Sequence, residues 1–120
     1  MPRYVDGFVL VVPKKKLAAY KTLAKKASKV WKEYGALEYR ECAGDDLKTG
    51  FGVPFPKLAN AKASETVVFA WIVYTSKAHR DATNKKIMKD PRIAAMCDPK
   101  NTPFDMKRMS MGGFKVMVEA

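Results

Sequence analysis

Four charged residues stand in segments of this sequence that are otherwise apolar, and a fifth, Arg80, stands near the start of a predicted helix; these are the side chains best suited to chemistry. Asp6 interrupts the segment YVDGFVLVVP, and the segment PFDMKRMSMGGF places an acid and two bases in a methionine-rich stretch. A buried charge must find a partner, so we expect these side chains to line one polar pocket. The predicted pocket consists of Asp6, Arg80, Asp105, Lys107 and Arg108.

Two interpretations of this polar pocket are open. Its surplus positive charge would favour a small anionic or enolic ligand. In a catalytic version, Asp6 or Asp105 would take a proton, and Arg108 or Lys107 would hold the resulting oxyanion. The alternative is a set of structural ion pairs that fix strand register and dimer contacts, with Arg108 paired to Asp6 or Asp81. No catalytic dyad has a recognisable spacing, so the sequence leaves open whether the protein is an enzyme.

Histidine and cysteine give no sign of a metal or haem site. His79 is the only histidine, and a place at the end of a helix is favoured over a role as general base. Cys42 and Cys97 form no Cys-x-x-Cys pair and are expected to be buried, reduced thiols. The sequence therefore predicts neither a metal nor a cofactor.

A small set of strands and helices must position these residues. Apolar and alternating patterns predict strands at 4–12, 36–42, 66–75 and 106–118, and helical periodicity predicts helices at 14–34, 76–89 and 91–96. Gly35 is a plausible helix C-terminal cap, whereas Ser76 and the pair Asp90-Pro91 are typical of helix N-termini. The segment 43–64 is rich in glycine and proline, which predicts a loop, a lid or dimer arm, with a short edge strand at 51–55.

The order strand, helix, strand, strand, helix, strand indicates an α+β, ferredoxin-like βαββαβ fold, with helices on one face of the sheet. The third strand, TVVFAWIVYT, is apolar on both faces. An exposed apolar sheet face marks an association surface, and a second copy packed face to face is its simplest cover. The sequence thus predicts one domain, 1–120, that forms a homodimer.

The charge of the chain is the remaining global feature. Its net charge of +11 arises from 23 basic residues, many of them lysines on one face of the helix predicted at 14–34. A solvated helix face is the favoured interpretation, and nucleic acid is disfavoured as a partner because lysine lacks the planar fork with which arginine reads bases. The alternative is a basic accessory protein that contacts nucleic acid or lipid through this helix. No signal peptide or membrane span is apparent, so a cytoplasmic location is expected.

Several segments, in order along almost the whole chain, resemble the YbaA-like family of uncharacterised bacterial proteins. They are YVDGFVLVVP, KEYGALEYREC, ETVVFAWIVYTSKAHRD, DPR and PFDMKRMSMGGF. The resemblance implies the dimeric α/β-barrel superfamily, in which two ferredoxin-like protomers pack their sheets into a barrel. That superfamily includes cofactor-independent monooxygenases, lactone isomerases, haem peroxidases and stress-associated proteins, so the fold leaves the chemistry open. We therefore expect a small-molecule-binding protein, with a cofactor-independent monooxygenase or isomerase as the alternative.

Overall fold

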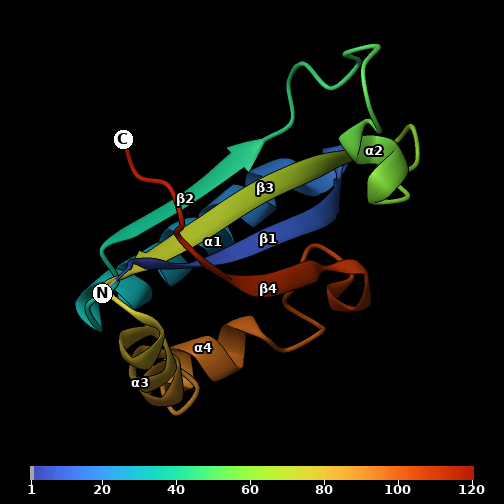
Figure 1. Cartoon of the computed structure of the whole chain (residues 1–120). Coiled ribbons are helices and arrows are strands. Elements are labelled where there is room, and N and C mark those ends of the chain that lie inside the picture. Colours follow the sequence, from blue (N-terminus) through green and yellow to red (C-terminus); the bar gives the residue numbers. More distant parts are fainter. Residues whose placement is uncertain (1) are drawn as a thin grey trace.

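The computed structural model describes residues 2–120 and consists of one four-stranded antiparallel sheet with helices packed on one of its faces (Figure 1). Along the chain the elements are β1 (Tyr4–Pro13), η1 (Lys14–Lys16), α1 (Leu17–Glu33), β2 (Glu38–Ala43), α2 (Phe55–Leu58), β3 (Glu65–Tyr74), α3 (Lys77–Ile87), α4 (Pro91–Met96), η2 (Met106–Arg108) and β4 (Ser110–Lys115). The strand order β2-β3-β1-β4 is that of a ferredoxin-like fold, as the sequence predicts.

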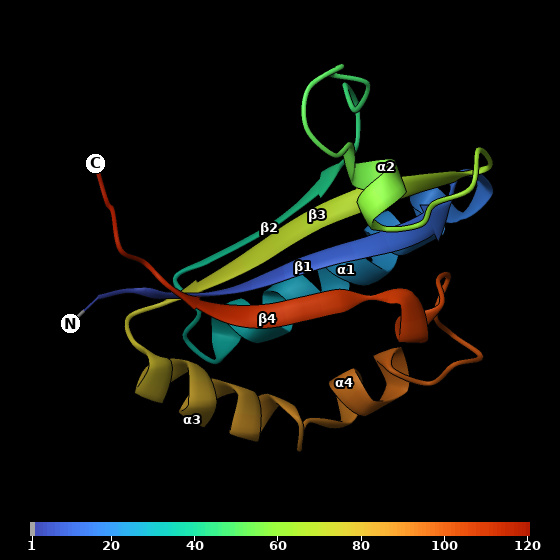
Figure 2. The same ribbon diagram turned by 45° about the vertical axis from the view of Figure 1, so that its right-hand side comes forward.

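Strand register assigns every side chain of the central strands to one of two faces. β1 pairs with β3 from Tyr4 opposite Tyr74 to Pro13 opposite Glu65. Even-numbered residues of both strands point toward the helices and form the core, which includes Leu10, Val12, Val68, Ile72 and Tyr74. Odd-numbered residues point to the opposite face. Since α1, α3 and α4 all lie on the even-numbered side, we call the other side the open face (Figure 2).

Local capping explains where the helices begin and end. Gly35 adopts φ of 105° directly after α1, a left-handed conformation that favours glycine. Ser76 Oγ accepts the backbone N–H of His79 at 3.1 Å, and Asp90 Oδ1 accepts that of Arg92 at 2.9 Å. Each bond satisfies an N–H group that the first turn of a helix would otherwise leave free. The predicted caps of these helices are therefore confirmed.

Two predictions for the less regular segments are wrong. The last strand begins at Ser110 rather than at residue 106, because Asp105 Oδ1 accepts the Lys107 N–H at 3.0 Å and starts the 3-10 turn η2. The segment 51–55 contains no strand. Its end instead opens the short helix α2, where proline in the first turn sets a helical φ without losing a needed hydrogen bond.

The termini and the loop 44–64 lie at opposite ends of the sheet (Figure 2). At the terminal end, the N–H of Val116 donates to the Arg3 carbonyl at 3.0 Å. At the other end, α2 reaches the open face, where the Phe55 ring centroid lies 6.0 Å from that of Phe69. Phe69 is 44% exposed and Phe114 on the same face is 61% exposed. Val11 and Val67 on this face are buried, but the larger part of the open face is apolar and at least partly exposed in the single chain.

Candidate functional site

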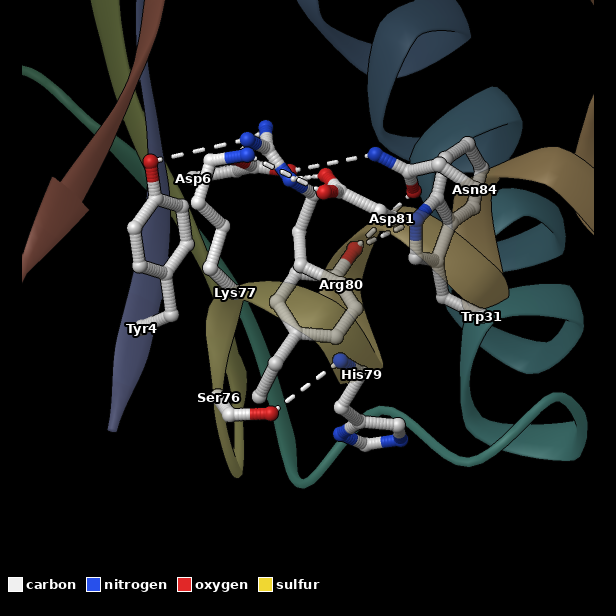
Figure 3. Close-up of polar contacts among 10 residues, drawn as sticks. Tyr4, Asp6, Trp31, Ser76, Lys77, His79, Arg80, Asp81 and Asn84 are labelled. Atoms are coloured by element: carbon white, nitrogen blue, oxygen red, sulfur yellow. Dashed lines mark hydrogen bonds and ion pairs between the residues drawn. The ribbon is translucent and has the colours of Figure 1, made fainter. Parts of the chain in front are cut away.

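Asp6 and Arg80 form a buried ion pair between the start of β1 and the first turns of α3 (Figure 3). Asp6 is only 2% exposed. Its Oδ1 accepts a hydrogen bond from Arg80 Nη1 at 2.8 Å, and its Oδ2 accepts one from Asn84 Nδ2 at 3.3 Å. Burial raises the pKa of Asp6, and Arg80 and Asn84 act in the opposite direction. Both carboxylate oxygens therefore have donors inside the protomer.

The guanidinium of Arg80 is surrounded on its other sides as well. Its Nε donates to Asp81 Oδ1 at 2.8 Å, and its carbon atom Cζ lies 4.8 Å from the centroid of the Tyr4 ring. Desolvation lowers the pKa of Arg80, but the carboxylates of Asp6 and Asp81 together raise it by more, so the pKa lies above its ordinary value. The arginine is fully engaged by two carboxylates and an aromatic ring.

A chain of hydrogen bonds continues from this pair into the core (Figure 3). Tyr74 Oη donates to Asn84 Oδ1 at 3.2 Å, and Trp31 Nε1 donates to Tyr74 Oη at 3.1 Å. The chain links α3, β3 and α1. His79 lies beside it, with Nδ1 accepting the Thr75 N–H at 3.0 Å. Across residues 2–120, no buried side-chain nitrogen or oxygen is left without a hydrogen-bond partner.

The other three residues of the predicted pocket lie elsewhere. Asp105, which caps η2, and Lys107 within it are both exposed. The sequence predicts that Arg108 pairs with Asp6 or Asp81, and this is wrong: Arg108 Nη1 lies 2.7 Å from Glu65 Oε2. Glu65 lies seven residues along β3 from Ile72, the residue opposite Asp6, and seven residues of strand span about 23 Å. The five side chains therefore do not surround one pocket: two form a pair at one end of the sheet and three lie at the other.

A different part of the molecule is hollow. A cavity of about 180 Å³ lies between the sheet, α1, α4 and the segment 97–109. Five aromatic side chains line it, and we call it the aromatic cavity: Phe8, Tyr20, Trp31, Tyr39 and Phe104. Aliphatic and methionine side chains form most of the remaining wall, together with Arg40, Glu41, Cys97 and Thr102. None of the five residues of the predicted pocket belongs to this lining.

One carboxylate reaches the wall of the aromatic cavity. Glu41 points from β2 toward α1, where Tyr20 Oη donates to its Oε1 in a short hydrogen bond and Tyr39 Oη donates to its Oε2 at 2.6 Å. Burial raises the pKa of both tyrosines, and Glu41 raises it further. The phenols therefore stay neutral and remain hydrogen-bond donors. We call these three residues the Tyr–Glu–Tyr cluster.

The Tyr–Glu–Tyr cluster was not singled out from the sequence, although part of its signal was present. Alternation in β2 predicts Tyr39 and Glu41 on one face, and helical periodicity places Tyr20 on the apolar side of α1. A carboxylate that faces a helix must find donors there. What the pattern lacks is the pairing of residues 20 and 41, which only the packing of α1 on β2 decides.

The lysines of α1 lie outside the aromatic cavity. The predicted solvent face is confirmed, since Lys21, Lys25, Lys29 and Lys32 are all exposed. Lys21 and Lys25 line a second, outer hollow that shares Tyr20 and Glu41 with the aromatic cavity. The Tyr–Glu–Tyr cluster thus separates an apolar interior from a basic exterior.

The remaining reactive side chains do not gather into a site. Cys42 and Cys97 are both exposed and free, so the prediction of buried thiols is wrong. Cys42 is exposed because its side chain points to the open face from an edge strand. Within the described part of the chain, no group of three or more His, Cys, Asp or Glu side chains could hold a metal ion. None of the described helices is long and apolar enough to cross a bilayer.

Comparison with known proteins agrees with the fold. The chain is similar in structure to a dimeric ferredoxin-like protein from an uncultured marine organism, with a TM-score of 0.59 and 13% sequence identity. The match covers the full length of both chains. An uncharacterised NIPSNAP domain protein from Burkholderia xenovorans gives a TM-score of 0.62 at 18% identity, over 98% of this chain and 94% of that one. At these identities the likeness concerns the fold alone.

Sequence comparison identifies the family. The chain is 44% identical over 117 residues to the uncharacterised protein YbaA of Escherichia coli K12, covering 98% of each protein. The Shigella flexneri YbaA protein matches to the same extent. Residues 3–106 match the family model DUF1428, described as a protein of unknown function. The chain therefore belongs to the DUF1428 family, which confirms the resemblance stated from its sequence motifs.

Proposed function

We propose that the protein binds a small, largely apolar molecule in the aromatic cavity. The observation that carries this proposal is the cavity itself: about 180 Å³ of space lined by five aromatic side chains, with a single carboxylate at its wall. Ligand pockets in proteins have this composition, with mostly apolar walls and a few placed polar groups. An engineered apolar cavity of about 150 Å³ binds benzene, so this one has room for a molecule with one substituted ring.

The proposal differs from the polar pocket expected from the sequence. Asp6 and Arg80 already have hydrogen-bond partners within the protomer, and their geometry favours a structural ion pair that holds α3 against β1. The aromatic cavity instead combines free volume with an accessible acceptor group. Small-molecule binding therefore remains the function that we favour, at a different place in the fold.

We also propose that the working unit is a homodimer packed through the open face. Support comes from the exposed aromatic side chains Phe69 and Phe114 on that face. Further support comes from the loop 44–64, whose Phe51, at 87% exposed, lacks any cover in the single chain. The similar marine protein is described as dimeric. A second copy would bury this surface against an identical one.

Toluene is a suitable probe for the aromatic cavity, and its binding can be measured by NMR of the tryptophan indole N–H groups. The chain has two tryptophans, of which Trp31 lines the cavity and Trp71 lies on the open face. We expect millimolar toluene to shift the indole N–H signal of Trp31 and to leave that of Trp71 in place. A Trp71→Phe variant would assign the two signals.

Filling the cavity provides the decisive comparison. Ala27 lines the aromatic cavity, whereas Ala19 is exposed on the same helix. We expect Ala27→Leu to abolish the toluene-dependent shift and to raise the free energy of unfolding by roughly 0.5 to 2 kcal/mol, as cavity-filling changes do. Ala19→Leu should leave toluene binding unchanged. Toluene binding that survives Ala27→Leu, or no shift of Trp31 in the wild type, would refute the proposed function.

A further inference from the structure

We propose that the aromatic cavity selects a neutral ligand with a hydroxyl group on a ring-sized apolar body, a phenol or an enol, and that Glu41 is the acceptor that selects it. This inference rests on the proposed function, because it assigns a ligand class to the same cavity. It follows from three properties of the site: the free acceptor capacity of Glu41, the lack of a cationic side chain that faces into the cavity from the described residues, and the shape of the space.

The first property is the unused capacity of the Glu41 carboxylate. Each carboxylate oxygen can accept two hydrogen bonds. Glu41 Oε1 accepts one from Tyr20 and Oε2 accepts one from Tyr39. One acceptor position therefore remains on each oxygen. The two tyrosine hydroxyls hold the carboxylate in place, so a ligand that donates a hydrogen bond finds its acceptor already oriented.

The second property is the charge of the wall. Glu41 is the one carboxylate among the described residues that line the aromatic cavity. Arg40 also touches the cavity, but its side chain lies on the open face, where its Nε donates to Glu38 Oε1 at 2.7 Å. The lysines of α1 line only the outer hollow. With no cation inside, an anionic ligand would meet a carboxylate without compensation, whereas a neutral hydroxyl would donate to it.

The third property is the shape of the space. Phe104 packs edge-on against Tyr20, with ring centroids 5.4 Å apart and planes at 81°. Trp31 and Tyr39 are tilted at 50° with centroids 6.1 Å apart. These two aromatic pairs border the cavity on the side of the Tyr–Glu–Tyr cluster. A planar ring fits such walls through edge and face contacts, and its hydroxyl then lies toward Glu41.

Two probes that differ only by a hydroxyl test this inference. We expect p-cresol to bind the wild-type protein at least about tenfold more tightly than toluene, because a hydrogen bond to a charged group discriminates by about this factor. The Trp31 indole N–H signal measures both affinities in titrations. Equal affinities for the two probes would overturn the inference while leaving the proposed function intact. If neither probe shifts Trp31, both the inference and the proposed function fail.

Variants of the cluster distinguish its chemistry from general packing. In Glu41→Gln we expect the preference for p-cresol over toluene to shrink to about threefold or less, since a neutral amide is a weaker acceptor than a carboxylate. In Tyr39→Phe we expect p-cresol to bind more tightly than in the wild type, because Glu41 loses one of its own donors. Toluene affinity should change little in either variant.

Glu38→Gln is the matched control. Glu38 lies on the same strand as Glu41, but it points to the open face and pairs with Arg40. We expect this variant to keep the full preference for p-cresol. A preference lost equally in Glu38→Gln and Glu41→Gln, or weaker p-cresol binding in Tyr39→Phe, would overturn the assignment of Glu41 as the acceptor.

Discussion

At the scale of single residues, the buried carboxylate of Asp6 is held by a compact set of partners. Taking a carboxylate out of water costs several kcal/mol, and this cost is why burial raises the pKa of Asp6. Arg80 and Asn84 offset it with one hydrogen bond to each oxygen. The buried carboxylate depends on this pair, because Asp6 without Arg80 would lose its only cation, whereas Arg80 without Asp6 would keep Asp81.

Removal of Arg80 tests this dependence. In Arg80→Met we expect the free energy of unfolding to fall by about 3 to 5 kcal/mol, since Asp6 would keep its charge without a cation. The double variant Asp6→Leu with Arg80→Met should recover much of that loss, because apolar replacement of both partners can be nearly neutral. Urea denaturation of the single and double variants measures both values.

Asp81 provides the control for this pair. It also bonds Arg80, but its side chain is 52% exposed, so Asp81→Asn should cost less than about 1 kcal/mol. An Arg80→Met protein as stable as the wild type would contradict the account of Asp6 as a buried, paired charge.

The predictable part of the site follows from the same residue-level physics. The need of Asp6 for a partner was visible in the sequence, because the charge interrupts an apolar strand. The identity of that partner could not be predicted from the sequence, because Asp6 and Arg80 are separated by 74 positions. The Tyr–Glu–Tyr cluster escaped prediction for the same reason: faces of strands and helices can be predicted from periodicity, but contacts between them depend on packing.

At the scale of elements, Arg108 joins η2 to the start of β3. Its Nη1 donates to Glu65 Oε2 at 2.7 Å, and its Nη2 donates to Glu65 Oε1 at 3.1 Å and to the Asn60 carbonyl at 2.8 Å. This bidentate contact helps to fix the turn that precedes β4. It also explains why the sequence misplaced the start of β4: the pattern from Met106 onward is compatible with a strand, and a contact with a residue 43 positions away helps to hold the turn.

The Arg108–Glu65 ion pair predicts that the stability of the folded protein depends on pH. Arg108, the Lys62 N–H and nearby charges lower the pKa of Glu65 to about 2, below its ordinary value of about 4.3. Because the folded protein binds this proton less readily than the unfolded chain, the stabilisation is present above about pH 4.3 and is lost as the pH falls toward 2. We expect Glu65→Gln to flatten the fall in melting temperature over this range.

Thermal melts followed by circular dichroism between pH 2 and 6 measure this effect. Glu119→Gln is the control, since its side chain is 59% exposed and its nearest cation, Arg3, is 3.6 Å away. We expect that variant to melt like the wild type at every pH. If Glu65→Gln retains the full acid dependence, the Arg108–Glu65 pair contributes nothing to it.

At the scale of the whole molecule, the two faces of the sheet differ in what covers them. The helices cover the even-numbered side of β1 and β3, whereas the open face presents Val5, Val9, Phe69, Trp71 and Phe114 around a shallow hollow. Gly7 lies beneath the Phe114 ring, and a Cβ atom there would come within 3.3 Å of it. The glycine therefore leaves room for the Phe114 ring close to the backbone of β1.

Light scattering of the wild type and two variants tests the proposed dimer. We expect a mass of about twice the 13.4 kDa of the chain at micromolar concentration, because an apolar face of this kind associates with its own copy. Phe69→Glu should give a folded monomer, since two copies of a charge would be buried at the interface without partners. The control is Met88→Glu, which replaces another exposed apolar side chain, 61% exposed after α3 on the helix side, and should remain dimeric. A wild-type mass of one chain would refute the dimer, and a Phe69→Glu protein that is folded by circular dichroism yet still dimeric would move the interface away from the open face.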